Sequence, residues 1–410
     1  MTGDNTGSAE HSVFERLGIS EVLNAAGTKT RVGGTRLRPE AAQAMQEASD
    51  GFVRISDLQA EASKRIAEVT NADAGYVTTG ASAALTLAAA ACLAGDDLGM
   101  MNRLPNTDGI ANKIVMARSH RTGYDHALRL AGAKIVDVGT LDRDLGSGST
   151  NLKLWELDDA IGEDTVAVGY VATPRSEPSL KTVADVAHEN GVPVIVDAAA
   201  ELPPKSNLSR FIDQGADLVA FSGGKAIRGP QATGILAGRQ DLIRSVAFQQ
   251  LDMDIIEGLW DPPRELFGEA PIDGVPRHGI GRGMKVGREE LVGIITAFES
   301  FVDEDDQETF DTWDERAKRM ADRLRDMDGL HVSLTGGEPD EVTNVTLQVD
   351  DSVTGFGNLE LVRRLQQHDP QVYVGFTDAP DAPILLNPVC LTDDEVGQVT
   401  DILVNLITED

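Results

Sequence analysis

A lysine follows an apolar segment near the middle of the sequence. Residues 218–221 have the length of a strand buried on both faces, and the segment stops at Ser222-Gly223-Gly224. Lys225 therefore lies just beyond a predicted strand end. The two glycines let the backbone adopt conformations closed to other residues and let a flat ligand approach. Because a deprotonated amine attacks an aldehyde, whereas the guanidinium of arginine stays charged, we interpret Lys225 as a lysine that forms a Schiff base.

Two alternative interpretations place Lys225 in a phosphate-binding loop or in an exposed turn. The phosphate-loop motif requires a glycine six residues before the lysine and a hydroxyl residue directly after it. Val219 and Ala226 occupy those positions, which excludes the motif. An exposed turn is the usual place for a lysine. However, the chain has only ten lysines against 26 arginines, so a lysine kept inside a glycine-rich loop is less easily explained as incidental.

A carboxylate closes a second apolar strand. Asp197 follows the apolar residues 192–196 and precedes Lys225 by 28 residues, which leaves room for one crossover between neighbouring strands. On its own, Asp197 is most simply a cap for the next segment. If it instead contacts a ring N–H, a buried carboxylate would keep a pyridine nitrogen protonated and make the ring an electron sink.

Two more strand ends carry polar groups. A short strand passes through Thr79 and Gly80 into an alanine-rich helix, so the free N–H groups at the helix start, with the hydroxyls of Thr79 and Ser82, predict a phosphate site. A plain hydroxyl cap is an equally good interpretation of this feature alone. His120 follows a strand at residues 114–117, where an imidazole could lie over a planar ring, although a lone histidine is more often structural.

The order of these segments predicts the fold. Strands alternate with helices over residues 70–240, which is typical of an α/β protein with a doubly wound, mostly parallel sheet. Ligands bind such sheets at the carboxyl ends of the strands. The residues Thr79, Gly80, His120, Asp197 and Lys225 are all assigned to such ends, which strengthens each assignment. The glycine-rich residues 279–284 follow no strand, so a dinucleotide-binding motif is rejected there.

The sequence divides into three parts. Residues 1–12 are polar and small, which predicts a disordered tail. Residues 13–285 form the predicted large domain, including a glycine-punctuated loop at 23–35 that is too polar for a core. Residues 286–410 alternate helices and short strands, which predicts a small C-terminal α+β domain.

Composition narrows the class of protein. The chain has 410 residues, two cysteines without paired spacing and no long apolar run, so we expect no metal site, no membrane segment and a cytoplasmic location. Its net charge of −31 argues against nucleic acid as a partner. Dispersed acidic residues and arginine preferred to lysine are also what we expect of a halophilic protein, because molar salt screens self-repulsion.

With these residues in place, the chain resembles the fold-type-I pyridoxal-phosphate enzymes. It is similar to the group that contains L-seryl-tRNA(Sec) selenium transferase and D-glucosaminate-6-phosphate ammonia-lyase. The resemblance runs from about Val22 to Leu403, and the lysine motif is its most specific part. The matching motifs are Asn24-Ala-Ala-Gly-Thr, Thr79-Gly-Ala-Ser-Ala-Ala, Val196-Asp-Ala, Ser222-Gly-Gly-Lys-x-x-Arg-Gly-Pro-Gln and Gly281-Arg-Gly-Met-Lys-Val-Gly.

The resemblance implies a role for each matched residue with pyridoxal 5′-phosphate as cofactor. It implies Lys225 as the Schiff-base lysine and proton shuttle, and Asp197 as the partner of the pyridine nitrogen. Ala199 and His120 would pack on the ring. Arg282 would reach a phosphate or substrate anion, across a dimer interface. The residues implied around the cofactor phosphate are Thr79, Gly80, Ala81, Ser82 and Ser222.

The resemblance also implies a reaction. Little more than 20 residues precede the Asn24 motif, and we find no RNA-binding domain there, so a lyase that acts on a small hydroxylated amino acid or amino-sugar acid is favoured over a selenium transferase. Such a lyase would catalyse α,β-elimination with release of ammonia. Alternatives are a transamination or desulfuration enzyme and a non-catalytic binding protein. Enzymes of this fold usually share sites between subunits, so a homodimer or larger homo-oligomer is expected.

Overall fold

The computed structural model describes residues 12–140, 151–252, 254–337, 340–377, 379 and 382–408. All but the last residue of the predicted tail lies outside this part of the chain. The chain forms two compact units. The large unit is Leu37–Glu304, and the small unit combines Met1–Arg36 with Asp305–Asp410.

A seven-stranded sheet organises the large unit. The strand order is β2-β8-β7-β6-β5-β3-β4, and β4, β3, β5, β6 and β7 are mutually parallel. Strand β8 runs antiparallel to both of its neighbours. The structure confirms the predicted mostly parallel α/β sheet. The strands are β2 Ala74–Thr78, β3 Lys113–Ala117, β4 Lys134–Val138, β5 Thr165–Val171, β6 Val194–Asp197, β7 Leu218–Ser222 and β8 Gly234–Gly238.

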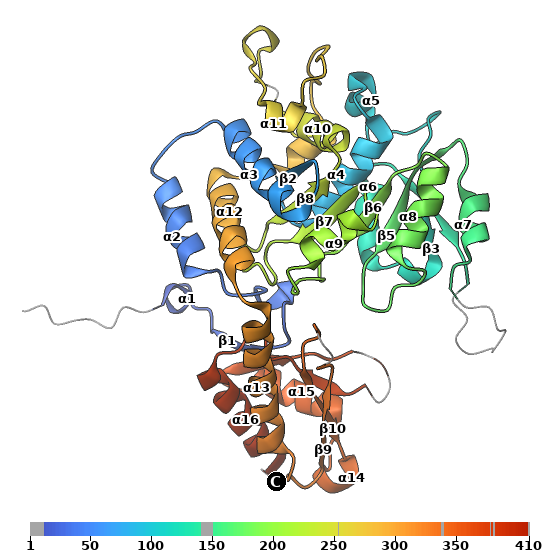
Figure 1. Cartoon of the computed structure of the whole chain (residues 1–410). Helices are drawn as coiled ribbons and strands as arrows, with labels where there is room; N and C mark the ends of the chain where they lie inside the picture. Colours follow the sequence, from blue (N-terminus) through green and yellow to red (C-terminus); the bar gives the residue numbers. More distant parts are fainter. Residues whose placement is uncertain are drawn as a thin grey trace, which may run out of the picture. The chain divides into compact units, whose positions relative to one another are not determined.

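Helices cover both faces of this sheet, which is why its strands read as continuous apolar runs. Successive side chains of a strand point to opposite faces. In β7, Val219 and Phe221 therefore join one core cluster, whereas Leu218 and Ala220 join the other. Helices α2, α3, α7, α8, α9 and α12 contribute to the first cluster, and α4, α5, α6, α10 and α11 contribute to the second (Figure 1).

The sequence explains where α2 begins and why α4 is buried. Pro39 opens α2 at the first helical position, where its missing N–H costs nothing. The alanine-rich α4 is buried along almost its whole length because it lies against the sheet. The helices are α2 Pro39–Ala48, α3 Ile55–Thr70, α4 Ala81–Ala94, α5 Leu98–Arg103, α6 His126–Leu130, α7 Leu154–Ala160, α8 Leu180–Glu189, α9 Asn207–Asp213, α10 Gln240–Gln249, α11 Arg264–Phe267 and α12 Arg288–Asp303, with short 3-10 turns η2 Arg118–His120, η3 Gly123–Asp125, η4 Glu257–Leu259 and η5 Ile280–Met284.

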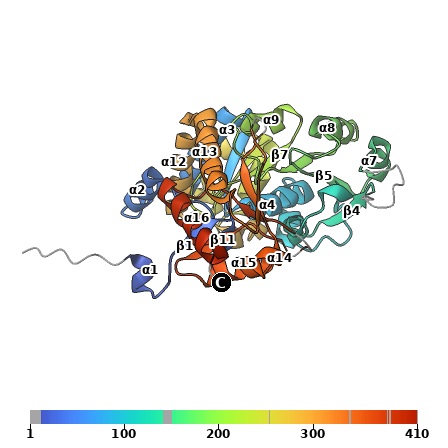
Figure 2. The same ribbon diagram turned by 90° about the horizontal axis from the view of Figure 1, so that it is seen from below.

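The small unit is an α+β unit with its own core. Strand β1, Val22–Ala25, pairs in parallel with β11, Gln371–Val374. Strands β12, β10 and β9 form an antiparallel sheet in that order. Helices α13 and α16 pack together, as Figure 2 shows. The remaining bounds are α1 Val13–Arg16, η1 Thr30–Val32, α13 Asp306–Leu324, β9 Leu330–Thr335, β10 Asn344–Val349, α14 Asp351–Thr354, α15 Asn358–Gln367, β12 Ile384–Leu386 and α16 Asp393–Thr408.

Two features differ from the sequence-based expectations. The segment at 23–35, predicted to be a loop too polar for a core, begins with β1, whose Leu23 and Ala25 are buried against the small unit's core. The large unit is Leu37–Glu304 and not the predicted 13–285. Residues before Leu37 belong to the small unit, where β1 pairs with β11, and α12 belongs to the large unit because it packs its apolar face against α2 and α3. Within the described ranges, we find no helix with the length and apolar composition needed to cross a membrane.

Candidate active site

Lys225 lies in a tight connection between β7 and the antiparallel β8. The connection closes on itself through its backbone: the Gly223 N–H donates to the Thr233 carbonyl at 2.8 Å, and the Gly229 N–H donates to the Gly223 carbonyl at 2.8 Å. The Arg228 N–H donates to the carbonyl of Lys225 at 2.9 Å. The lysine is therefore carried by a compact, hydrogen-bonded loop.

Close packing explains the two glycines before the lysine. A Cβ on Gly223 would lie 2.2 Å from Thr233 Oγ1, and one on Gly224 would lie 2.7 Å from the Cα of Gln231. Neither glycine has a positive φ, whereas Arg228 does, at 57°. Both glycines are required because the two sides of the loop approach too closely for a side chain.

Asp197 is the last residue of β6, next to β7 in the sheet. Its Cα partner across the strands is Ala220 of β7. The Ala199 N–H donates to Asp197 Oδ1 at 3.1 Å, which fixes the carboxylate in place. Burial raises the pKa of Asp197, and the bond from Ala199 and the charge of Lys225 act in the opposite direction. The site thus holds a desolvated carboxylate that a bound cation would stabilise.

A second carboxylate, which the sequence analysis missed, follows Asp197. The Glu201 N–H donates to the Ala198 carbonyl at 3.1 Å, and its own carbonyl accepts from Asn207 Nδ2 at 2.6 Å. Burial raises the pKa of Glu201 to about 7, helped by the charge of Asp197 and opposed by the charges of Lys225 and Arg210. The sequence could have indicated Glu201 because this carboxylate follows the strand-end residue Asp197 by four positions.

His120 ends η2, directly after β3. It is 5% exposed, and its ring meets the ring of Tyr170 edge-to-face with centroids 4.5 Å apart. Nδ1 accepts from the Val171 N–H at 3.5 Å, so Nε2 carries the proton, and among the described residues Nε2 has no hydrogen-bond partner. Burial lowers the pKa of His120 to about 4. At neutral pH the residue is an uncharged ring with one unused N–H donor.

The start of α4 carries the backbone donors that a helix leaves without an intrahelical partner. Gly80, with φ of 89°, is the N-cap and supplies no side-chain cap, so the competing interpretation of this turn as a plain hydroxyl cap is not supported. Ala81 and Ser82 are the first two helical residues, and their N–H groups point out of the helix end, where the positive end of the dipole favours an anion. A Cβ on Gly234, at the start of β8, would lie 2.5 Å from the Gly80 carbonyl carbon. The loop of Lys225 and the start of α4 are therefore in direct backbone contact.

The other predicted residues lie on the same edge or near it. Ser222 ends β7, opposite Gly234 of β8. The hydroxyl of Thr79 donates to the Met284 carbonyl at 3.1 Å, which ties the start of α4 to η5. Arg282 of η5 pairs with Asp252 of its own chain at 2.9 Å. Both residues line an open cavity of about 930 Å³. The Arg282 side chain therefore pairs with Asp252 and not with a group at the start of α4.

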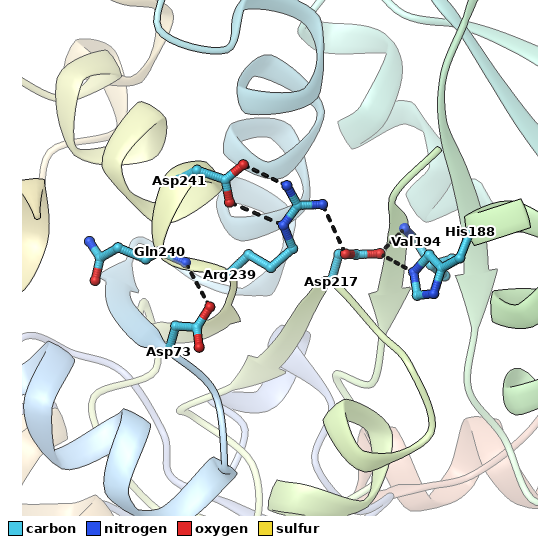
Figure 3. Close-up of polar contacts among 7 residues, drawn as sticks. All are labelled: Asp73, His188, Val194, Asp217, Arg239, Gln240 and Asp241. Carbon is cyan, nitrogen blue, oxygen red and sulfur yellow. Dashed lines mark hydrogen bonds and ion pairs between the residues drawn. The ribbon is translucent and has the colours of Figure 1, made fainter. Parts of the chain in front are cut away.

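A polar cluster fixes the opposite end of β7 (Figure 3). Asp217, directly before β7, is buried; its Oδ2 accepts from His188 Nε2 and from the Val194 N–H, both at 2.8 Å. Its Oδ1 accepts from Arg239 Nη1 at 3.1 Å, and Arg239 also pairs with Asp241. The cluster joins β6, β7, α8 and the end of β8 at the edge of the sheet away from Lys225.

The geometry therefore gathers an amine, two carboxylates, a neutral imidazole and an anion-binding helix end at the carboxyl edge of the sheet. The amine of Lys225 and the Asp197 carboxylate come from neighbouring strands, and their charges influence each other. This set suits a flat, anionic aldehyde with a basic ring nitrogen: the amine would bind the aldehyde, Asp197 the ring nitrogen and the start of α4 the phosphate.

Comparison with known proteins agrees with this arrangement. D-glucosaminate-6-phosphate ammonia lyase from Salmonella typhimurium is 27% identical over 398 residues, which cover 95% of this chain and 96% of the relative. A 5′-C-glycyluridine monooxygenase-decarboxylase from a Streptomyces species is 28% identical over 372 residues, covering 88% and 83%. L-seryl-tRNA(Sec) selenium transferases also match: the one from Aquifex aeolicus is 22% identical over 392 residues, covering 86% and 77%, and the one from Mannheimia succiniciproducens is 28% identical over 184 residues, covering 40% and 38%.

A solved structure of D-glucosaminate-6-phosphate ammonia-lyase superposes with a TM-score of 0.77 and 25% identity, covering 97% of this chain and 98% of that one. The resemblance inferred from the motifs is thus confirmed along nearly the whole chain. The family model described as Aminotransferase class-V matches residues 35–253, which include Gly80, His120, Asp197 and Lys225. The chain therefore belongs to the class-V aminotransferase family and has the fold-type-I architecture of pyridoxal-phosphate-dependent enzymes.

Proposed function

We propose that the protein is a pyridoxal-phosphate-dependent lyase that catalyses α,β-elimination, with release of ammonia, on a hydroxylated amino acid or amino-sugar acid. The observation that carries the proposal is the placement of Lys225 and Asp197 at the ends of adjacent strands, beside the open start of α4. The similarity to D-glucosaminate-6-phosphate ammonia lyase over 95% of the chain points to the same type of reaction.

Each site residue has a task in this reaction. Bound pyridoxal phosphate supplies the electron sink for the charge left when the α-proton is removed. Lys225 Nζ accepts that proton, and the Asp197 carboxylate holds the ring nitrogen in its charged form. The N–H groups of Ala81 and Ser82 bind the phosphate. His120 supplies a flat apolar face and an Nε2–H donor, while Glu201 can hold or release a proton near neutral pH.

A selenium transferase or an aminotransferase is the runner-up. The chain is 27% identical to the ammonia lyase over 96% of that protein, and 22% identical to the selenium transferase from Aquifex aeolicus over 77% of that protein. Its net charge of −31 also disfavours an RNA substrate. An aminotransferase needs a cation that clamps the carboxylate of two successive substrates. Arg363 and Arg364 of α15 both pair with Glu360 on the same helix, which makes them poor candidates for that clamp.

The test is a substrate panel with linked readouts. Purified protein is incubated with 3-hydroxy amino acids and 2-amino-2-deoxy sugar acids, with and without a terminal phosphate. Ammonia and 2-oxo acid are measured together, and elimination releases them in equal amounts. Formation of pyridoxamine phosphate without free ammonia, reversed by 2-oxoglutarate, would establish an aminotransferase instead.

The role of Lys225 is tested separately. Borohydride reduction followed by peptide mapping should place the cofactor on Lys225. Lys225→Ala should abolish both the label and the turnover. Lys181→Ala, which changes an exposed lysine paired with Asp185 on α8, is the control and should leave both unchanged. A label on any other lysine would refute the assignment.

The proposal includes the setting in which the enzyme works. A homodimer or larger homo-oligomer is supported by large apolar side chains left exposed on the large unit, such as Phe52 at 98% and Leu259 at 79%. A reducing cytoplasm suits the two free cysteines, Cys92 and Cys390. The excess of acidic residues supports function at high salt.

A further inference from the structure

The chain passes twice between the two units. One lies between Arg36 and Leu37, and the other between Glu304 and Asp305. On the large-unit side of these passages, Arg38 and Glu304 form a two-pronged ion pair, with Nη1–Oε1 and Nη2–Oε2 distances of 2.6 and 2.8 Å. The Arg38 side chain is 5% exposed, which is unusual for a charged group and requires that its donors be satisfied.

Arg38 is also bonded to the loop that carries Lys225. Its Nε donates to the Ile227 carbonyl at 2.8 Å, and its backbone N–H donates to the Arg228 carbonyl at 3.0 Å. Ile227 is fully buried, and the Arg228 N–H in turn donates to the Lys225 carbonyl. Arg38 therefore holds the main chain two and three residues beyond the reactive lysine.

The end of α12 is bonded to the second active-site loop. Lys205 Nζ donates to the Val302 carbonyl at 2.8 Å and also to the Glu304 carbonyl. Lys205 lies in the segment after Glu201, between β6 and α9. The passage at Glu304 is thus connected to the loop after Asp197 through Lys205, and to the loop after Lys225 through Arg38.

The geometry of the Arg38 contacts is specific to a guanidinium. Two parallel N–H groups engage the carboxylate of Glu304 while the third, Nε, reaches a carbonyl on the other side. Lysine carries the same charge on a single nitrogen and cannot make these contacts together. An ion pair that served only to add stability would gain little from burial, because desolvation offsets the attraction.

We propose that Arg38 and Glu304 are positioning residues that fix the Lys225 loop and thereby set the reactivity of Lys225. The proposal rests on the proposed function in one respect: Lys225 must be the amine that binds the cofactor. It extends that function because it gives two residues outside the site a role in setting the reactivity of the lysine.

The test compares Arg38→Lys and Glu304→Gln with a matched control, Arg244→Lys. Arg244 is 5% exposed and donates to the carbonyls of Phe267, Ala270 and Pro271, so its replacement disturbs an equally buried arginine away from the Lys225 loop. Three quantities are measured for each protein. They are the melting temperature, the pH dependence of Lys225 acylation in the cofactor-free protein by mass spectrometry, and kcat and KM of the loaded enzyme.

We expect both variants at the pair to shift the midpoint of Lys225 acylation by about half a pH unit or more and to lower kcat about tenfold with little change in KM. Arg244→Lys should lower the melting temperature only. If Arg38→Lys does not fold, Glu304→Gln alone decides, since its side chain keeps the shape of the glutamate. An unchanged acylation midpoint and kcat in Glu304→Gln would overturn the proposal. Failure of wild-type Lys225 to take up the borohydride label would instead refute the proposed function.

Discussion

Glu201 is joined to Asp197 by one tight turn after β6, and the Asp197 charge acts on the Glu201 carboxyl. Burial is the main cause that raises the pKa of Glu201 to about 7, and the negative charge of Asp197 is the second cause. Burial raises the pKa of Asp197 as well, so neither carboxyl ionises as readily as it would in water. Asp197 receives a hydrogen bond from the Ala199 N–H, which favours its charged form.

The raised pKa of Glu201 predicts a pH-dependent stability of the cofactor-free protein. The folded state binds this proton more tightly than the unfolded state, so between about pH 4.3 and 7 the contribution of Glu201 to stability falls as the pH rises. Glu201→Gln removes this loss. Between pH 5 and pH 8, the melting temperature of the variant minus that of the wild type should therefore increase by on the order of 1–2 °C. Glu189→Gln, at an exposed position on α8, is the control, and equal behaviour of the two variants would refute the prediction.

The lowered pKa of His120 predicts a pH dependence of stability with the opposite sign. Burial lowers its pKa to about 4, so the folded state binds the proton less tightly than the unfolded state. Stability contributed by the neutral ring is complete above about pH 6.5 and is lost as the pH falls toward 4. His120→Phe keeps an aromatic ring beside Tyr170 and should lose less stability than wild type between pH 6.5 and 4.5 in thermal melts. A larger loss in the variant would contradict the neutral assignment.

The variant Asp197→Asn tests whether the charge of Asp197 is needed for turnover and not for cofactor binding. The amide keeps the size of the side chain and leaves the proposed contacts of Lys225 and the start of α4 with the cofactor intact, so cofactor content after dialysis should stay close to wild type. Turnover should fall by the order of 10³-fold or more, because a neutral amide does not stabilise the charged ring nitrogen. Near-normal turnover would leave Asp197 as a strand-end cap. Asp185→Asn on the surface of α8 serves as the control.

Asp217→Asn tests the cluster at the other end of β7. The buried carboxylate accepts hydrogen bonds from three groups, and the amide cannot replace its charge-assisted bonds to Arg239 and His188. The free energy of unfolding in urea should fall by about 1–3 kcal/mol. Asp241→Asn removes the more exposed partner of the same Arg239 and should cost less than about 1 kcal/mol. Cofactor content should not change, since the cluster lies away from Lys225; loss of cofactor would show that the two ends of β7 are coupled.

Assembly should depend on salt. Dilution from molar to about 0.1 M salt lengthens the screening distance and exposes subunits with a net charge of −31 to mutual repulsion. We expect light scattering to show a homo-oligomer in molar KCl that dissociates and loses activity at low salt. A monomer that is fully active in dilute buffer would contradict both parts of this prediction.

The strand ends that carry Lys225, Asp197 and His120 were predictable from sequence, because apolar runs that stop at polar residues mark the carboxyl edge of a parallel sheet. Their chemical roles stay predictions. Glu201 was not identified because its altered pKa depends on burial by segments distant in sequence. Strand β1 was missed for a related reason: its four residues gain their partner only when β11, almost 350 residues later, lies beside them.

The position of strand β8 limits the insertions and deletions that homologous chains can carry near Lys225. It begins at Gly234, against Gly80, so residues 226–233 set a fixed length of chain between Lys225 and the start of α4, the proposed sites of the Schiff base and of the phosphate. One inserted residue would displace one against the other by about 3.3 Å, more than a hydrogen bond tolerates. We therefore expect insertions and deletions among homologues to be absent from 225–234, and changes of substrate to arise in loops that do not connect these two elements.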